Sequence, residues 1–298
     1  MDSVTHALAA AAACIAIGRL DLLPWAVAGG VAPDIDAFFG RFSERDPRLF
    51  VFVHGGITHS IAGAVAMASV AVLAVSVVTG MPTGGAFVAL AAGLLGAGLH
   101  VSLDLLAYPG IPLLYPASTR KHTLGVFAGP SVAIMAASIL FLGCILAGSC
   151  GLAGIPFYAG LVLGYIGLRS LLKAYLAVAR QGRTIPTINP FRWYLVRETD
   201  EEYIVDRWSV GRGSTWTRRY PRYAGIGSSD IAAIADLHEV RRLFYTSYIV
   251  VAERDGNTVR LRDPLRSDGL IWYPPHYAEV VLPESIIGRP GGRPSSDQ

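Results

Sequence analysis

Residues 54–79 read HGGITHSIAGAVAMASVAVLAVSVVT, in which two histidines lead into an apolar run that contains no charged residue. From Ile57 onward, the run is long enough for an α-helix to cross about 30 Å of hydrocarbon. The stretch therefore predicts a membrane helix that carries His54 and His59 at its first end. Neutral imidazole is a common ligand of divalent metals, so this end is a candidate metal site.

Other apolar segments predict a bundle of membrane helices around this one. Long runs follow at about 83–107, 123–148 and 152–179. The segments 4–18 and 22–32 are too short for a perpendicular span, so we expect a hairpin of short helices that other helices shield. Residues 1–183 are thus predicted to be an all-α polytopic membrane domain, with four long spans and an N-terminal short-helix hairpin.

Charges in the connecting segments predict the orientation in the membrane. The loops 37–56 and 108–122 and the segment after residue 179 carry Lys and Arg, whereas the turns near 81–84 and 149–151 are uncharged. By the positive-inside rule, the basic loops and the C-terminus face the cytoplasm. We therefore predict a multi-pass protein of the cell membrane with a cytoplasmic C-terminus.

The last part of the chain has a different composition, because Arg, Asp, Glu and Tyr replace the apolar runs. Strand-like segments occur at 192–198, 202–210, 247–254, 257–262 and 278–282. Residues 229–245 have apolar residues at helical spacing after a Ser-Ser-Asp start, which predicts one helix. We expect a small soluble α+β or mostly β domain over 184–288, and a disordered tail over 289–298.

Overall composition limits the classes of function. The chain is 52% hydrophobic and 16% charged, against about 25% charged in ordinary soluble domains. Its net charge of +3 is too small to indicate a nucleic-acid partner, and we predict none. Cys14, Cys144 and Cys150 lie in apolar segments without CxxC spacing, so we interpret them as small hydrophobic residues.

Polar side chains of the first half form a candidate ligand set for a divalent metal. They are His6, Asp34, Asp36, His54, His59, His100 and Asp104. His100 and Asp104 are four residues apart and share one face of a helix. If segment 4–18 crosses outward and 22–32 returns, all of these residues reach the same leaflet. Imidazole nitrogen and carboxylate oxygen together favour zinc, and we expect one to three ions.

Structural roles are the alternative for each of these residues. His100 and Asp104 could form a polar pair that only bridges helices, and His54 or His59 could be part of a helix cap. His6 could be an ordinary polar residue at a helix start, while the Asp34 and Asp36 carboxylates could be solvated. His122 follows Arg120 and Lys121 and is interpreted as interfacial, although these cations could hold a phosphate. His238 and His276 are interpreted as structural.

Four motifs in order resemble a known family. They are Thr5-His6 after Asp2, Ala32-Pro33-Asp34-Ile35-Asp36, the 54–60 stretch, and His100-Val101-Ser102-Leu103-Asp104 followed by a Tyr-Pro-Gly segment at 108–110. Together they resemble the YdjM-type family of LexA-regulated inner-membrane proteins, described as metal-dependent hydrolases. The stretch 189–193 also resembles the start of the tail domain of longer members. A more distant similarity to zinc-dependent phospholipase C and single-strand nucleases hints at phosphoester chemistry.

The resemblance implies that the seven residues are the polar signature of the family. One departure is Gly55, where the family usually has Arg after the first histidine. If that Arg binds an anionic substrate, Arg120 or Arg41 would have to replace it here. We therefore expect a hydrolase of a phosphoester, with a membrane lipid as a natural substrate, Arg120 and Lys121 as substrate-binding residues, and Asp36 or Asp104 as general base.

Other functions are open from the sequence alone. A non-catalytic membrane protein could bind metal for stability or sensing and use residues 184–298 to engage a cytosolic protein partner. Ion transport is disfavoured, because the helices predicted at 57–79 and 123–148 carry almost no polar residue below their ends. Bound metal without turnover would distinguish the binding protein from the hydrolase.

Overall fold

The structure is a computed structural model that describes residues 1–38, 46–80, 83–180, 182–274 and 276–286. The chain divides into two compact units. The first unit comprises 1–45, 51–179 and 186–190, and the second comprises 46–50, 180–185 and 191–298. The predicted 289–298 tail lies outside the described residues.

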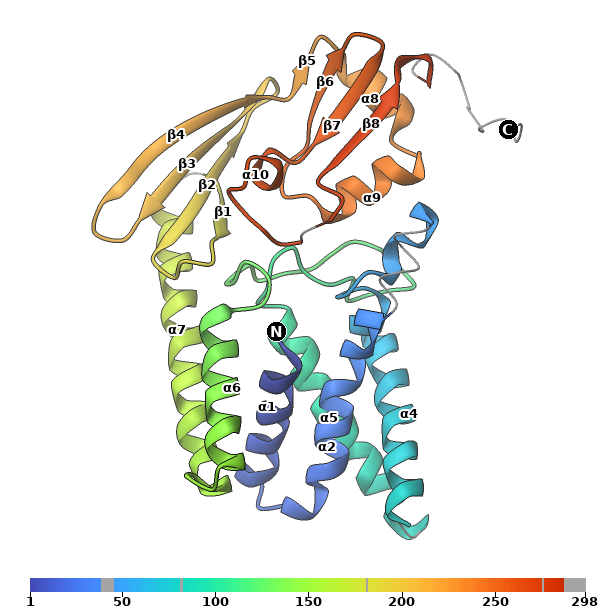
Figure 1. Ribbon diagram of the computed structural model, residues 1–298, viewed down its shortest axis with the longest axis vertical. Helices are drawn as coiled ribbons and strands as arrows, with labels where there is room; N and C mark the ends of the chain where they lie inside the picture. Colours follow the sequence, from blue (N-terminus) through green and yellow to red (C-terminus); the bar gives the residue numbers. More distant parts are fainter. Residues whose placement is uncertain (39–45, 81–82, 181, 275, 287–298) are drawn as a thin grey trace. The chain divides into compact units, whose positions relative to one another are not determined.

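The first unit is helical. Its helices are α1 (Ser3–Ala16), α2 (Leu23–Val31), α4 (Ile61–Thr79), α5 (Ala86–Asp104), α6 (Val132–Leu146) and α7 (Ile155–Ala179) (Figure 1). Short 3₁₀ helices connect them: η1 (Leu20–Leu22), η2 (Ala32–Phe38), η3 (Pro47–Phe52), η4 (Ile57–His59), η5 (Thr83–Gly85) and η6 (Leu152–Gly154). Successive helices run in opposite directions, so the starts of α1 and α4 lie at the same end as the last turns of α2 and α5 (Figure 1).

Small residues allow α2 and α5 to pack closely. A Cβ atom on Gly29 would lie 2.1 Å from the Gly93 carbonyl oxygen. A Cβ on Gly96 would lie 2.0 Å from the Ala26 carbonyl oxygen and 2.7 Å from the Gly30 backbone nitrogen. Glycines at such positions let helix backbones touch, which is the usual way that membrane helices gain packing energy. This contact brings the Gly30 carbonyl to the face of α5 that carries His100.

Gly96→Ala is expected to destabilise the helical unit by about 1–3 kcal/mol, because the added methyl group must push α2 and α5 apart. Thermal unfolding of the detergent-purified protein measures this effect. Gly98→Ala on the same helix is the matched control, since a Cβ there meets nothing within 4 Å. Equal unfolding temperatures for the two variants would contradict the close α2–α5 contact.

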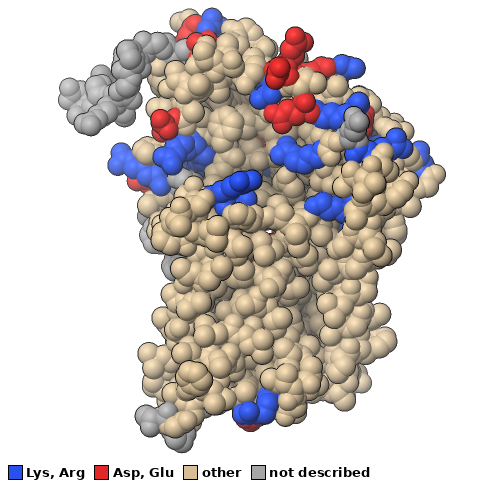
Figure 2. All heavy atoms as spheres, turned by 180° about the vertical axis from the view of Figure 1, so that it is seen from behind, with Lys and Arg blue, Asp and Glu red and all other residues tan. Residues whose placement is uncertain are grey.

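Among the described residues, three helical segments are long and apolar enough to cross a membrane: Ile61–Thr79, Ala86–Asp104 and Leu152–Ala179. The helix Ile61–Thr79 exposes apolar side chains on its surface, since Leu73 is 65% exposed and Val78 is 86% exposed. Figure 2 shows that the visible face of these helices carries almost no charged side chain. Contiguous exposed apolar surface of this kind matches the hydrocarbon of a bilayer.

The predicted count of four long spans is not confirmed, because the helix expected over 123–148 begins only at Val132. With 15 residues, α6 is shorter than a standard span. Gly125 and Gly129 have positive φ values of 56° and 79°, and Pro130 follows them. These residues stop helix formation. The segment before α6 instead pairs with the segment that follows α5, where the Tyr108 N–H donates to the Phe127 carbonyl at 2.7 Å.

The second unit contains β-sheets and short helices. In the described part of the chain, one four-stranded sheet has the order β1 (Arg183–Pro186), β2 (Arg192–Glu198), β3 (Glu202–Ser209) and β4 (Gly213–Pro221). The other has the order β5 (Tyr223–Ala224), β6 (Val251–Asp255), β7 (Thr258–Arg262) and β8 (Glu279–Pro283). The remaining elements are α8 (Ser228–Ile234), α9 (His238–Thr246), α10 (Pro264–Ser267) and η7 (Glu284–Ile286).

A soluble β-sheet domain therefore follows the helices, as predicted, with differences in detail. The single helix expected over 229–245 is two helices, because Leu237 has extended backbone with ψ 137° and begins a new helix. The strand expected to start at Ser247 begins at Val251. We did not predict β1, β4 or β5. Exposed Arg and Thr side chains weaken the alternating apolar signal of β4, whose only buried residue is Tyr220.

Candidate metal centre

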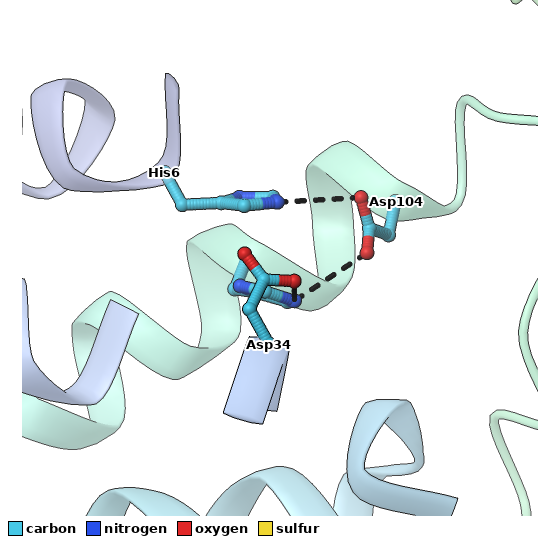
Figure 3. A group of neighbouring side chains, drawn as sticks. His6, Asp34 and Asp104 are labelled. Atoms are coloured by element: carbon cyan, nitrogen blue, oxygen red, sulfur yellow. Dashed lines mark ion pairs between the residues drawn. The ribbon is translucent and has the colours of Figure 1, made fainter. Parts of the chain in front are cut away.

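The candidate ligands come from four separate segments of the helical unit. His6 lies in α1, Asp34 in η2 directly after α2, His59 in η4 directly before α4, and His100 and Asp104 in the last part of α5. These five side chains are buried. In Figure 3, His6, Asp34 and Asp104 point toward one another. Antiparallel helices thus bring residues that are far apart in sequence to one end of the bundle.

Asp104 contacts three imidazoles. Its Oδ1 lies 3.4 Å from His6 Nε2, and its Oδ2 lies 3.0 Å from His59 Nε2 and 3.4 Å from His100 Nε2. The ammonium group of Met1 also forms an ion pair with it. One buried carboxylate therefore faces several nitrogen atoms that can bind either a proton or a metal ion.

His100 is held in the orientation of a metal ligand. Its Nδ1 donates a hydrogen bond to the Gly30 carbonyl at 2.7 Å, because a carbonyl oxygen can only accept. In the neutral ring, Nε2 then presents its lone pair 3.7 Å from Asp34 Oδ1 and 3.4 Å from Asp104 Oδ2. A lone pair that faces carboxylate oxygens is unfavourable unless a cation lies between them. A backbone carbonyl on the other ring nitrogen is also the common support of metal-binding histidines.

Asp36 has a different environment, because all its contacts are hydrogen-bond donors. Oδ1 accepts from His54 Nδ1 at 2.7 Å, and Oδ2 accepts from the Gly55 N–H at 3.1 Å and the Thr58 hydroxyl at 2.6 Å. His59 Nδ1 lies 3.0 Å from the same Oδ2. Burial alone would raise the pKa of Asp36, but the hydrogen bonds from His54 and His59 outweigh it and hold the pKa below its usual range. Asp36 thus holds two imidazoles by their Nδ1 atoms.

Gly55, at the position where the related family usually has Arg, has a backbone conformation that suits glycine. Its φ is 73°, in the left-handed region that L side chains rarely adopt. Its N–H is one of the donors to Asp36. Gly55 therefore contributes to the turn that presents His54 and His59, although it lacks the Arg side chain of the family pattern.

The charges of the pocket favour a cation. Burial alone would raise the pKa of Asp34, yet contacts with His59, His100 and His6 lower it to about 2. Burial alone would lower the pKa of His59, but the carboxylates of Asp104, Asp34 and Asp36 raise it well above its usual value. Carboxylates concentrated in a buried place thus require positive charge, which a divalent ion can supply.

Buried polar atoms without hydrogen-bond partners also indicate that the pocket fits a metal ion. Five of the buried side-chain atoms without a hydrogen-bond partner in the described part of the chain belong to the candidate ligands: His6 Nδ1 and Nε2, Asp34 Oδ1, His59 Nε2 and His100 Nε2. Unpaired buried polar groups are rare in proteins and indicate a missing ion or water. Ligand atoms of His6, Asp34, His100 and Asp104 all lie within 4.8 Å of one another, as do those of Asp34, His54 and His59. These residues fit a divalent metal ion.

The structure gives less information about Arg120 and Lys121, the residues predicted to bind substrate. Arg120 is exposed and its backbone N–H donates to the Ser118 hydroxyl, while Lys121 is half-buried. Arg41, the alternative cation, lies outside the described residues. The binding of substrate by Arg120 and Lys121 stays a prediction.

Two partners of the site were not found from the sequence. The Ser3 hydroxyl donates to Asp34 Oδ2 at 2.6 Å, and the Gly30 carbonyl supports His100. A single serine near a chain start and a backbone carbonyl carry no recognisable signal in a sequence. The Thr58 hydroxyl also supports the site, because it donates to Asp36 Oδ2 at 2.6 Å. Ser60 caps α4 by accepting from the Gly63 N–H at 3.0 Å.

Comparison with known proteins gives the family. A family model described as YdjM inner membrane protein matches residues 1–174. This chain belongs to the YdjM family. No curated protein and no solved structure matches it at a significant level. In this YdjM family member, every candidate metal ligand lies inside the matched region, whereas nearly all of the β-sheet unit lies beyond it.

Proposed function

We propose that this YdjM family member is a membrane-bound, metal-dependent hydrolase that acts on a phosphoester, with a lipid phosphoester as the natural substrate. The observation that carries the proposal is the orientation of His100, whose Nδ1 donates to Gly30 while Nε2 faces the Asp34 and Asp104 carboxylates. The nitrogen-rich donor set favours zinc. Its position at one end of apolar helices gives access to lipid head groups.

Each residue has a role in this proposal. His6, His59, His100, Asp34 and Asp104 would hold an ion, which supplies a more acidic water and polarises the phosphoryl oxygen. We assign Asp36 a positioning role, because its oxygens already accept hydrogen bonds from the residues that it orients. Asp104 Oδ2 keeps the expected role of proton acceptor.

Substrate binding would use charge near the membrane surface. Arg120 and Lys121 would contact the phosphate, since paired cations suit phosphate oxygens. The positive-inside rule supports a cytoplasmic position for this end of the bundle. A substrate at that leaflet reaches the pocket without crossing the bilayer.

Metal removal tests the proposal. Detergent-purified protein is assayed on bis(p-nitrophenyl) phosphate and on phospholipids in mixed micelles, before and after treatment with a chelator. We expect chelation to abolish hydrolysis and added Zn²⁺ to restore it. Metal-replete protein that hydrolyses none of these esters would support the non-catalytic binding function, and activity that survives complete removal of metal would contradict the proposed mechanism.

A further inference from the structure

We propose that the pocket holds two divalent ions bridged by the Asp34 carboxylate, an inference that rests on the proposed metal-dependent function. Asp34 belongs to both groups of possible ligands, one with His6, His100 and Asp104 and the other with His54 and His59. Asp34 Oδ1 lies 3.5 Å from His59 Nε2 and 3.7 Å from His100 Nε2, so this one oxygen faces a ligand of each group, while Oδ2 accepts from the Ser3 hydroxyl. Paired ions about 3.5–4 Å apart are a recurrent arrangement for phosphoester hydrolysis.

One ion cannot use all of these ligands. Donors of a single zinc ion lie about 2.0–2.2 Å from it, so two of them can be at most about 4.4 Å apart. Among the described residues, His54 groups within 4.8 Å with Asp34 and His59, and is not grouped with His6, His100 and Asp104. The His54 imidazole is therefore left without a metal role unless a second ion is bound.

The first position is the buried one. His6 stacks on His100, with ring centroids 3.7 Å apart, and both side chains are 0% exposed. In the described structure, neither ring nitrogen of His6 has a hydrogen-bond partner. Two protonated imidazoles at this distance would repel each other, whereas two neutral imidazoles can bind one ion together with Asp34 and Asp104.

The second position is prepared by Asp36. Its Oδ1 accepts from His54 Nδ1 and its Oδ2 lies 3.0 Å from His59 Nδ1, so Asp36 contacts neither Nε2 atom. His59 Nε2 instead faces Asp34 Oδ1 at 3.5 Å and Asp104 Oδ2 at 3.0 Å. The two rings are nearly perpendicular, at 86°, with centroids 5.4 Å apart. The His54 side chain is 37% exposed, so this position is more open than the first. We expect its ion to exchange more readily and to be the one that meets the substrate.

Charge also supports a second ion. The side chains of Asp34, Asp36 and Asp104 are at most 7% exposed. Counting these carboxylates, the Met1 ammonium group that pairs with Asp104 and the ions, one divalent ion leaves the pocket neutral. Two ions leave net positive charge, which attracts an anionic phosphoester.

Metal stoichiometry tests the inference directly. The full-length protein in detergent is loaded with Zn²⁺, desalted, and analysed for zinc per chain by elemental analysis. We expect two ions for the native chain and one for His54→Ala. The His54 side chain is 37% exposed, so its removal leaves no large buried cavity and the variant is expected to fold. Asp34→Asn should retain one ion or none. His238→Ala, in α9 of the second unit, is the control and should retain two.

A spectroscopic readout keeps the result independent of activity. Loading with Mn²⁺ should give the electron paramagnetic resonance spectrum of a coupled pair in the native chain and of isolated ions in His54→Ala. One ion per native chain, or two ions in His54→Ala, would overturn the two-ion centre and leave the metal-dependent function standing. A native chain that binds no ion would overturn the proposed function itself.

Discussion

Asp104→Asn is expected to lower phosphodiesterase activity at least about a hundredfold and to reduce the bound metal. Asn has nearly the shape of Asp but lacks its charge, and the three imidazoles at 3.0–3.4 Å lose a shared anionic partner. Removing groups that only support metal ligands already costs about 10–100-fold in affinity or activity. Removing a carboxylate that faces the ion itself should cost at least as much.

The measurements for Asp104→Asn are zinc content and the initial rate on bis(p-nitrophenyl) phosphate. Size-exclusion chromatography in detergent checks that the variant is folded. Asp21→Asn is the control, because Asp21 is exposed and pairs with Arg19 in the α1–α2 connection. Native metal content and native activity in Asp104→Asn would show that the pocket is not the reaction centre.

Asp263→Ala is expected to destabilise the β-sheet unit by about 3–5 kcal/mol, because it leaves the buried Arg266 guanidinium without its counter-charge. The two side chains are 0% and 2% exposed, and Asp263 Oδ2 lies 2.9 Å from Arg266 Nε. Asp263 also accepts from the Tyr248 N–H at 2.8 Å and the Leu265 N–H at 3.1 Å. The substitution therefore removes the N-terminal cap of α10 as well.

Tryptophan fluorescence during urea unfolding measures this effect. Among the five tryptophans of the chain, only Trp25 lies outside the β-sheet unit. Asp255→Ala is the control, since the Asp255–Arg260 pair is exposed, separated by 3.8 Å, and worth less than about 1 kcal/mol. If Asp263→Ala lowers the free energy of unfolding as little as Asp255→Ala does, the structural role of the Asp263–Arg266 ion pair is contradicted.

The pKa of Asp263 indicates how the Asp263–Arg266 ion pair contributes to the stability of the β-sheet unit. Burial raises this pKa, and Arg266 and the two backbone N–H groups offset the rise only in part. A carboxyl whose pKa is raised in the folded state adds most to the free energy of unfolding at pH values below its pKa in the unfolded chain, which is about 3.9. This stabilisation is lost as the pH rises through the pKa of the folded state. The ion pair is therefore costly to bury, so Asp263→Ala/Arg266→Met should recover part of the stability that Asp263→Ala loses.

The sequence was sufficient for features that depend on local composition. The long apolar runs that form α4, α5 and α7 follow from the length of helix that hydrocarbon requires. The spacing of His100 and Asp104 places both side chains on one face of α5, because the helix repeats every 3.6 residues. The change to strand-like segments after the helices likewise predicts the β-sheet unit. Each of these inferences uses neighbours within a few residues of one another.

Inferences that need distant partners required the tertiary structure. The shortening of α6 follows from the pairing of Tyr108 with Phe127, which competes with helix formation before Val132. The positioning role of Asp36 depends on His54 and His59, which approach it only when η2 and η4 meet. The number of hydrogen-bond donors around a carboxylate cannot be read from residue type, so Asp36 was expected to be a metal ligand, like Asp34, and a possible general base.

The amino-acid sequence by itself determined the membrane helices, the residue types of the metal ligands and the presence of a β-rich unit, because hydrophobic length and helical periodicity are properties of short segments. Only the tertiary structure decided which carboxylate faces the ligands and which one orients them. It did so through the close approach of α2 and α5 at Gly29, Gly93 and Gly96, which brings the Gly30 carbonyl to His100. That contact depends on two backbones meeting, and no single segment of the chain contains it.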